Sequence, residues 1–226
     1  MITSQEMQKL EEYAADQGIF PLNLMENAGK QLYLTIKEEF AILGKHLVIF
    51  AGNGNNAGDA FVAAHHFCQE LPVIIFFFGE EWKLKDEAKV SLDQIKDSVN
   101  VIQINEEKNL ENFRFQKNLD YIFLDALLGL GIKGEIRDPI SFAIDYFNKQ
   151  NGKKVAVDLP SGIDPDTGEV KGKCCDVDLI VTFHDIKKGL AEKPELKEKT
   201  IVVDIGIPKG ITLPKKDTPV REIKIS

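Results

Sequence analysis

An apolar run, a glycine-rich turn and an alanine-rich segment follow one another between residues 46 and 67, and this succession limits the folds open to the chain. Residues 46–50 are short, apolar and rich in β-branched side chains, as in a buried strand. The glycines that follow allow tight turning, and residues 61–67 have the spacing and alanine content of a helix. A strand, a glycine-rich loop and a helix in this order present backbone N–H groups to an anion.

The glycine spacing matches neither of two common phosphate-binding motifs. It reads Gly-x-Gly-x-x-x-Gly, one residue longer than the dinucleotide fingerprint, and no Gly-Lys-Ser/Thr follows as in a P-loop. The loop carries Asn55, Asn56 and Asp59, whose oxygens suggest a site that also holds a cation or a polar ring. A plain strand-to-helix turn explains the segment equally well when it is taken alone.

Strand-like and helix-like segments alternate from residue 46 onward. The expected strands are 46–50, 73–78, 99–104, 121–125, 154–158, 179–183 and 200–204. The expected helices are 4–17, 21–36, 61–67, 87–96 and 139–148. This alternation predicts an α/β fold in which helices cover both faces of a mostly parallel central sheet.

Polar residues gather where these strands end. Asn53 to Asp59 follow the first strand, while Asp125 and Asp158 end the fourth and fifth. A further glycine-rich loop, 129–135, follows the fourth strand. Ligands of parallel sheets bind at the carboxyl ends of strands, so we expect these groups to share one site.

Composition excludes several other classes of protein. The net charge of −8 disfavours a nucleic-acid-binding surface. No apolar stretch approaches the ~20 residues of a membrane span, and residues 1–6 lack the basic start of a signal peptide. The three cysteines, an odd number, include the adjacent pair Cys174 and Cys175, so no disulfide framework is expected. We therefore expect a cytoplasmic protein.

Four blocks of sequence, with a fifth after the next strand, carry a family resemblance. They are residues 24–29, 52–59, 125–131, 157–164 and 182–190. Taken together and in order, they resemble the NAD(P)H-hydrate epimerase family, the YjeF N-terminal domain. The resemblance covers nearly the whole chain, which makes it more specific than any single motif.

The resemblance implies a single Rossmann-like three-layer domain over residues 1–226, usually a homodimer. Its activity would be interconversion of the R and S epimers of hydrated NADH and NADPH in nicotinamide nucleotide repair, with a bound potassium ion. The family often joins this domain to a larger dehydratase, for which 226 residues leave no room. A separate dehydratase acting on the S epimer is therefore the implied partner.

The resemblance also assigns roles to residues of this sequence. The implied substrate-binding residues are Asn55, Asn56, Ala57, Gly58, Asp59, Gly129, Leu130, Gly131, Ile132, Lys133, Gly134, Glu135 and Asp158. The implied potassium ligands are Asn56, Asp125 and Ser161, whose oxygens suit a hard ion. Asp158 would face the reacting ring, and Lys187 stands where the family has a lysine, so these two are the implied catalytic residues.

The implied substrate carries a hydroxyl on the ring carbon beside the ring nitrogen. Loss and return of water, or reversible ring opening, would each scramble that centre. Both routes need a group that gives and takes a proton, typically worth ~10²–10⁴-fold in rate. Asp158 is the candidate: partial burial would favour its protonated form, and a nearby cation would oppose that.

The chain departs from the family pattern at a few positions. Ala57 and Ala60 stand where glycine is usual, His65 where arginine is common, and Lys188 where proline precedes a glycine. A methyl group at Ala57 would clash if that residue needed a positive φ or close contact with phosphate.

Two other functions remain open at this level. The first is a non-catalytic scaffold of the same family that binds a nucleotide or a protein, since fold alone does not settle function. The second is hydrolysis or phosphoryl transfer on a nucleotide, against which the missing P-loop pair counts. Simple structural roles are also open: Asp158 could cap the turn at 160–162, and Asp125 could be a turn carboxylate.

Overall fold

The structure is a computed structural model in which residues 1–111, 113–132 and 134–208 are described. These residues form one seven-stranded sheet in the order β3-β2-β1-β4-β5-β6-β7, and every neighbouring pair is parallel. The strands are β1 (Lys45–Ala51), β2 (Val73–Phe77), β3 (Asn100–Gln103), β4 (Asp120–Ala126), β5 (Lys153–Val157), β6 (Leu179–Phe183) and β7 (Thr200–Val203). The predicted parallel sheet is confirmed, and each expected strand is present.

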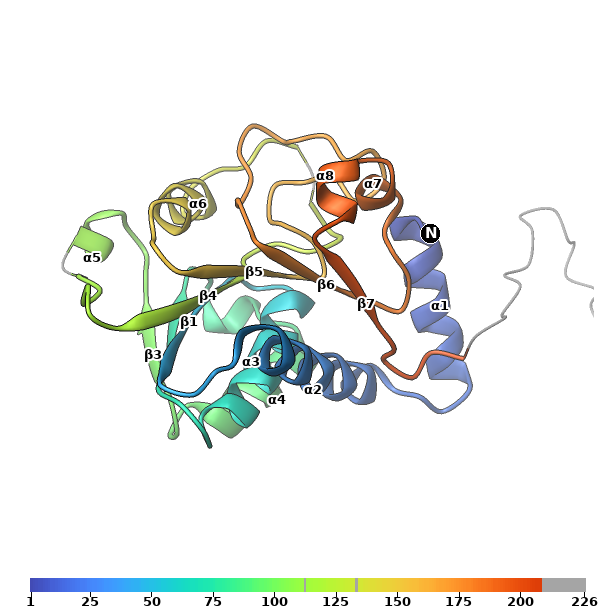
Figure 1. Ribbon diagram of the computed structural model, residues 1–226. Coiled ribbons are helices and arrows are strands. Elements are labelled where there is room, and N and C mark those ends of the chain that lie inside the picture. Colours follow the sequence, from blue (N-terminus) through green and yellow to red (C-terminus); the bar gives the residue numbers. More distant parts are fainter. Residues whose placement is uncertain (112, 133, 209–226) are drawn as a thin grey trace, which may run out of the picture.

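Helices cover both faces of the sheet (Figure 1). They are α1 (Ser4–Asp16), α2 (Pro21–Phe40), α3 (Asn55–Phe67), α4 (Asp86–Ile95), α5 (Lys108–Glu111), α6 (Ile140–Asn148), α7 (Lys188–Ala191) and α8 (Pro194–Lys197), with a 3₁₀ turn η1 (Glu81–Lys83). Helices α2, α3 and α4 lie on one face, α5, α6, α7 and α8 on the other, and α1 stands beside β7. The sequence did not indicate α5, α7, α8 or η1, because elements of three or four residues are too short to show a helical period.

The first helix forms for reasons visible in its own sequence. Thr3 and Glu6 make a reciprocal capping box, in which each side chain accepts a hydrogen bond from the other residue's backbone N–H. Gly18, with φ of +85°, follows the end of the helix. Met7, Leu10 and Ala14 form the buried stripe. The predicted helix at 4–17 is thereby confirmed.

The central strands β1, β2, β4, β5 and β6 are buried on both faces over most of their length, which explains their continuous apolar runs. In β1, Leu47 and Ile49 pack with the α2 and α3 side of the core, whereas Val48 and Phe50 belong to the core beneath α6. Phe50 makes an edge-to-face contact with Phe147 of α6, their ring centroids 5.2 Å apart.

The strand order changes direction where β1 and β4 meet. Strands β2 and β3 continue the sheet to one side of this pair, and β5, β6 and β7 continue it to the other. Open parallel sheets bind ligands at such a switch point. Gly52 follows β1 there, and a Cβ atom on it would come within 2.1 Å of the Leu127 carbonyl oxygen. The loop after β1 therefore touches the loop after β4, and α3 begins where the loop after β1 ends.

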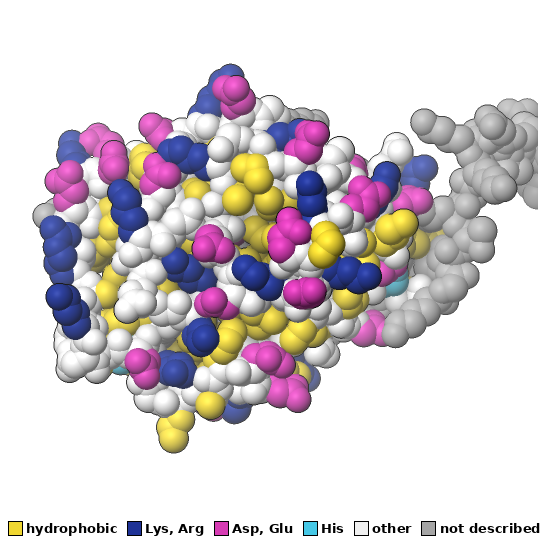
Figure 2. Space-filling model, turned by 45° about the horizontal axis from the view of Figure 1, so that its top comes forward, with side chains coloured by type: hydrophobic (Ala, Val, Ile, Leu, Met, Phe, Trp, Pro, Cys, Tyr) yellow, Lys and Arg dark blue, Asp and Glu magenta, His cyan; other side chains and the backbone are white. Residues whose placement is uncertain are grey.

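Side chains of both charge signs are interspersed over the face seen in Figure 2. Of the helices within the described residues, none has the length and apolar character needed to cross a membrane. The Lys-rich tail from residue 214 lies outside the described residues.

Candidate active site

The structure brings together four of the predicted site residues at the carboxyl edge of the sheet. Asn56 comes from the first turn of α3, Asp125 from β4, Asp158 from the residue after β5, and Ser161 from the turn that follows. All four are buried. Strands β4 and β5 are direct neighbours, so residues 36 positions apart in sequence become hydrogen-bond partners.

Asp125 and Ser161 form a hydrogen-bonded hub. The Ser161 backbone N–H donates to Asp125 Oδ2 at 2.7 Å, and the Ser161 hydroxyl donates to Asp125 Oδ1 at 2.5 Å. Burial raises the pKa of the Asp125 carboxyl, and the hydrogen bonds from Ser161 and Leu127 oppose that rise. Ser161 Oγ also accepts from the Leu128 N–H at 2.9 Å. This hub locks the loop after β4 to the loop after β5.

Asn56 fastens α3 to the same two loops. Its Nδ2 donates to the carbonyl oxygens of Val157, at 2.7 Å, and Leu128, at 3.0 Å. Its Oδ1 lies against Gly129, where a Cβ atom would come within 2.2 Å of that oxygen. Gly129 is therefore needed for the close approach of the amide.

The donor atoms of this cluster fit a monovalent cation. The Asn56 amide, the Asp125 carboxylate and the Ser161 hydroxyl supply oxygen, as do the Leu128 and Val157 carbonyls beside them. Hard cations prefer such ligands. The Asn56 amide nitrogen now faces the two carbonyls, and a cation there would require the amide to turn over and present Oδ1.

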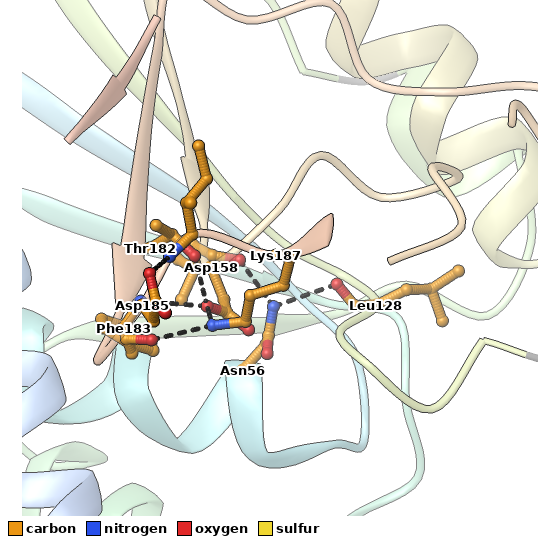
Figure 3. A network of polar contacts seen from close by, with 9 residues as sticks. Asn56, Leu128, Asp158, Thr182, Phe183, Asp185 and Lys187 are labelled. Atoms are coloured by element: carbon orange, nitrogen blue, oxygen red, sulfur yellow. Dashed lines mark hydrogen bonds and ion pairs between the residues drawn. The ribbon is translucent and has the colours of Figure 1, made fainter. Parts of the chain in front are cut away.

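Asp158 and Lys187 make a buried ion pair (Figure 3). Asp158 Oδ1 accepts hydrogen bonds from Thr182 Oγ1 at 2.9 Å, from the Phe183 N–H at 3.1 Å and from Lys187 Nζ. Lys187 is fully buried and also donates to the Phe183 carbonyl at 2.9 Å. The hydrogen bonds from the described residues thus go to Oδ1 of Asp158.

The backbone of Asp158 is held in an uncommon conformation. Its φ is +65°, a left-handed value that few residues other than glycine adopt, although Asp tolerates it. The Asp158 N–H donates to the Val181 carbonyl of β6 at 2.8 Å, which fixes this bend. Strain of this kind concentrates at functional sites.

Two further carboxyl groups lie in the electrostatic neighbourhood of this pair. Burial raises the pKa of Asp59 well above its usual range, and the charges of Asp158 and Glu11 raise it further while Lys187 opposes them. Burial and the charge of Asp158 likewise raise the pKa of Glu11, on α1. The Lys187 ammonium therefore interacts electrostatically with three carboxyl groups, and two of them, Asp59 and Glu11, resist ionisation.

We expect Asp59→Asn to stabilise the protein at neutral pH by about 0.5–2 kcal/mol. The folded state binds the Asp59 proton more tightly than the unfolded chain does. The free energy of unfolding therefore falls as pH rises above 3.8, the ordinary pKa of this group, until the raised folded-state pKa is passed. Denaturant unfolding measured from pH 3.5 to 8 should show a smaller fall in the free energy of unfolding for the variant than for the parent. The exposed Asp97→Asn serves as control, and equal pH dependence in both variants and the parent would contradict the expectation.

The predicted substrate loop at 55–59 proves to be the first part of helix α3. Asn55 is exposed there, whereas Ala57 and Gly58 are buried in the packing of α3. Ala57 lies within the helix and is not among the residues with positive φ, so its methyl group causes no strain. His65 is exposed in the last turn of α3, at the far end from the site.

The second predicted loop is only partly in contact with the cluster. Gly129 abuts Asn56, and Leu130 is half-buried. Gly131, Gly134 and Glu135 are exposed, and Ile132 is partly so. Lys133 lies outside the described residues.

Sequence reasoning missed Glu11, Thr182 and the Cys175 thiol, which hydrogen-bonds to Asp125. Each reaches the site only through packing of distant elements. For Glu11 the sequence did hold a signal, since an acidic residue lies there beside the apolar stripe of α1.

Comparison with known proteins supports one family. The family described as "YjeF-related protein N-terminus" matches residues 21–189. The NAD(P)H-hydrate epimerase of Nitrosopumilus maritimus is 34% identical, over 92% of this chain and 95% of that protein. The enzyme of the same name from Cenarchaeum symbiosum is 35% identical, with 92% and 95% covered.

Longer proteins and a solved structure are also similar. A bifunctional NAD(P)H-hydrate repair enzyme of Archaeoglobus fulgidus is 38% identical over 92% of this chain, which spans 42% of that protein. The crystal structure of yeast ynu0 matches with a TM-score of 0.75 and 25% identity, covering 90% of this chain and 87% of that one. The chain therefore belongs to the YjeF-related N-terminal domain family, in which it stands beside the NAD(P)H-hydrate epimerases.

Proposed function

We propose that this protein is an NAD(P)H-hydrate epimerase that interconverts the R and S forms of hydrated NADH or NADPH. The observation that carries the proposal is the buried Asp158–Lys187 pair at the carboxyl edge of the sheet, in which the hydrogen bonds from the described residues go to Oδ1 of Asp158. The match to proteins of that name, over 92% of this chain, supports it. A non-catalytic scaffold has no evident need for such a buried ion pair.

The substrate's diphosphate fits the start of α3. Gly54 is the N-cap of this helix and offers no side-chain hydrogen bond. The Ala57 and Gly58 N–H groups donate to the Gly54 carbonyl, so among the described residues the N–H groups of Asn55 and Asn56 are the ones left for an anion. Asn55, exposed in that turn, can add its amide. The hydrated ring then lies over β4 and β5, near Asp158.

The ion pair favours the ring-opening route. As the anionic partner of Lys187, Asp158 first accepts the proton of the ring hydroxyl through Oδ2. The hydroxyl oxygen becomes a carbonyl, the bond from that carbon to the ring nitrogen breaks, and the nitrogen takes up the electron pair of that bond together with the proton that Asp158 accepted. Closure on the opposite face reverses each step: Asp158 takes the proton from the nitrogen as the carbon–nitrogen bond re-forms and returns it to the carbonyl oxygen, which gives the other epimer.

Solvent oxygen distinguishes this route from loss and return of water. In H₂¹⁸O, ring opening is expected to epimerise the substrate faster than label enters the ring hydroxyl, whereas dehydration must introduce one solvent oxygen in each inversion. Mass spectrometry of the hydrate during the first turnovers measures the ratio. One label incorporated per inversion would overturn the ring-opening step.

We also propose that Asn56, Asp125 and Ser161 hold a potassium ion. When bound, it would supply fixed positive charge that ties together α3 and the loops after β4 and β5. Potassium chloride at 100 mM is expected to raise the Tm by about 2–5 °C over tetramethylammonium chloride of equal ionic strength. Ser161→Ala should lose this increment, whereas the control Ser91→Ala, at a buried serine of α4, should keep it. An equal Tm in both salts would refute the site.

Assembly and partners follow from the same proposal. We expect a homodimer, measurable by sedimentation, and a dehydratase that consumes the S epimer. The three cysteines are all free, which suits a reducing compartment such as the cytoplasm.

The decisive assay starts from one pure epimer of the hydrate. Addition of the protein should bring the R and S forms to equilibrium much faster than they equilibrate spontaneously. Chiral-phase or reverse-phase chromatography of samples taken over time measures the two forms. A rate equal to the spontaneous one, together with tight binding of a protein partner, would favour the scaffold function instead.

A further inference from the structure

A cavity of about 370 Å³ opens at the carboxyl ends of β1, β2 and β3, away from the cluster described above. Asn53 lines it from the loop after β1, Gly79 and Glu80 from the end of β2, and Asn105 from the end of β3. Its size falls within the ~300–1,000 Å³ typical of small-molecule sites. None of the residues assigned above to the ring, the diphosphate or the cation lines it.

The walls of this cavity are tied together. Asn53 Oδ1 accepts the Glu80 N–H at 2.8 Å, and a Cβ atom on Gly79 would come within 1.7 Å of that oxygen. Gln103 Nε2 donates to the Gly79 carbonyl at 2.6 Å and to Asn105 Oδ1 at 3.1 Å. Three strand ends are thus joined by side-chain bonds, so the cavity is a preformed feature.

The cavity and Asp158 lie on opposite sides of the start of α3. Strands β1, β2 and β3 form one half of the sheet, and Asp158 follows β5 in the other half. A dinucleotide whose diphosphate rests at the α3 N-terminus spans both halves. With its reacting ring at Asp158, its adenosine half reaches the cavity.

We propose, on the basis of the epimerase function above, that this cavity binds the adenosine half and that Glu80 selects the hydrated NADH form over the NADPH form. An acidic side chain at the end of the second strand is placed to accept hydrogen bonds from the ribose 2′- and 3′-hydroxyls. Glu80 is half-exposed and its partner Lys83 lies 3.0 Å away, also half-exposed. Such a pair is weak enough to exchange for ribose hydroxyls.

A 2′-phosphate meets unfavourable charge at this position. Glu80 and Glu81 are adjacent, and Lys83, the cation that lines the cavity beside them, is already shared with Glu80. Glu81 is held by Lys89 at 2.5 Å. The added phosphate would bring about two negative charges beside Glu80, and like charges in contact oppose binding.

The chain offers a reporter at this end of the sheet. Trp82 is the single tryptophan of the sequence, lies in η1 between Glu80 and Lys83, and is 78% exposed. Adenine nucleotides bound in the cavity should change its fluorescence. The probes are ADP-ribose and 2′-phospho-ADP-ribose, titrated both by fluorescence and by calorimetry.

ADP-ribose is expected to bind at least about tenfold more tightly than its 2′-phosphate. Glu80→Gln should lower this ratio about fivefold or more, because it removes the charge but keeps the shape. The matched control Glu81→Gln alters a neighbouring carboxylate that does not line the cavity and should leave the ratio within twofold. A wild-type ratio near one, equal effects of the two variants, or calorimetric binding with no change in Trp82 emission would each overturn the assignment.

The epimerase assay separates the two proposals. Equal kcat/KM for hydrated NADH and NADPH, unchanged by Glu80→Gln, would refute the role of Glu80 and leave the activity standing. Absence of epimerisation with the ADP-ribose preference intact would refute the activity and leave the binding site standing.

Discussion

Replacement of Asp158 by Asn is expected to lower kcat for epimerisation by about 10²–10⁴-fold, with a much smaller change in KM. The amide has nearly the same shape as the carboxylate but cannot accept and return a proton. Because Oδ1 is engaged by Thr182, Phe183 and Lys187, the side chain should remain in place. The loss of kcat therefore reports proton transfer through Oδ2. It is measured from initial rates with a pure epimer.

The same variant should also be less stable. Lys187 is fully buried, and Asp158 is the acidic partner of its ion pair in the described structure. Removal of one charge from a buried pair costs about 3–5 kcal/mol, since the other charge stays in a poorly solvating interior. Folding is therefore measured alongside activity, by denaturant unfolding.

A double variant separates the two effects. Asp158→Asn combined with Lys187→Met removes both charges and should recover much of the lost stability, while activity stays low. Asp185→Asn, at a half-buried carboxylate paired with the N-terminus, is the control and should keep near-parent activity. If Asp158→Asn retained more than about a tenth of the parent kcat, Asp158 would not be the proton-transfer group.

Substitution of Gly162 by Ala is expected to destabilise the protein by about 3–5 kcal/mol. Gly162 has a φ of +101°, and a Cβ atom on it would lie 1.9 Å from the Lys173 carbonyl oxygen. The backbone around Lys173 cannot move aside without breaking hydrogen bonds. The Lys171 N–H donates to the Gly162 carbonyl at 2.8 Å, and the Cys175 N–H donates to the Ser161 carbonyl at 2.9 Å.

This change should also disturb the hydrogen bonds between Ser161 and Asp125, because Ser161 precedes Gly162 and donates two hydrogen bonds to Asp125. The matched control is Gly172→Ala. Gly172 has a similar positive φ of +85° but no atom within 4 Å of its added Cβ, so it isolates backbone strain of about 1–2 kcal/mol. An equal loss of stability in Gly162→Ala and Gly172→Ala would contradict the expectation, because it would mean that the overlap with the Lys173 carbonyl adds no destabilisation.

The sequence by itself determined the strands, the longer helices and their order. Apolar runs bounded by turn residues located the seven strands of the described residues, and the central ones show the longest runs because a strand buried on both faces must be apolar throughout. The Thr3 and Glu6 capping box located the first helix, since capping depends on residues three positions apart. The sequence blocks also identified the family, which the comparisons confirm.

Only the tertiary structure decided how the side chains meet. Lys187 pairs with Asp158 across 29 residues, and Glu11 joins them electrostatically from a helix at the other end of the chain. Gly129, in the loop after β4, proved to leave room for the Asn56 amide, and the segment at 55–59 proved to be helix. The physical reason is that propensity and period are properties of neighbouring residues. Burial, charge pairing and the direction of a lone carboxylate oxygen depend on which strands the sheet places side by side.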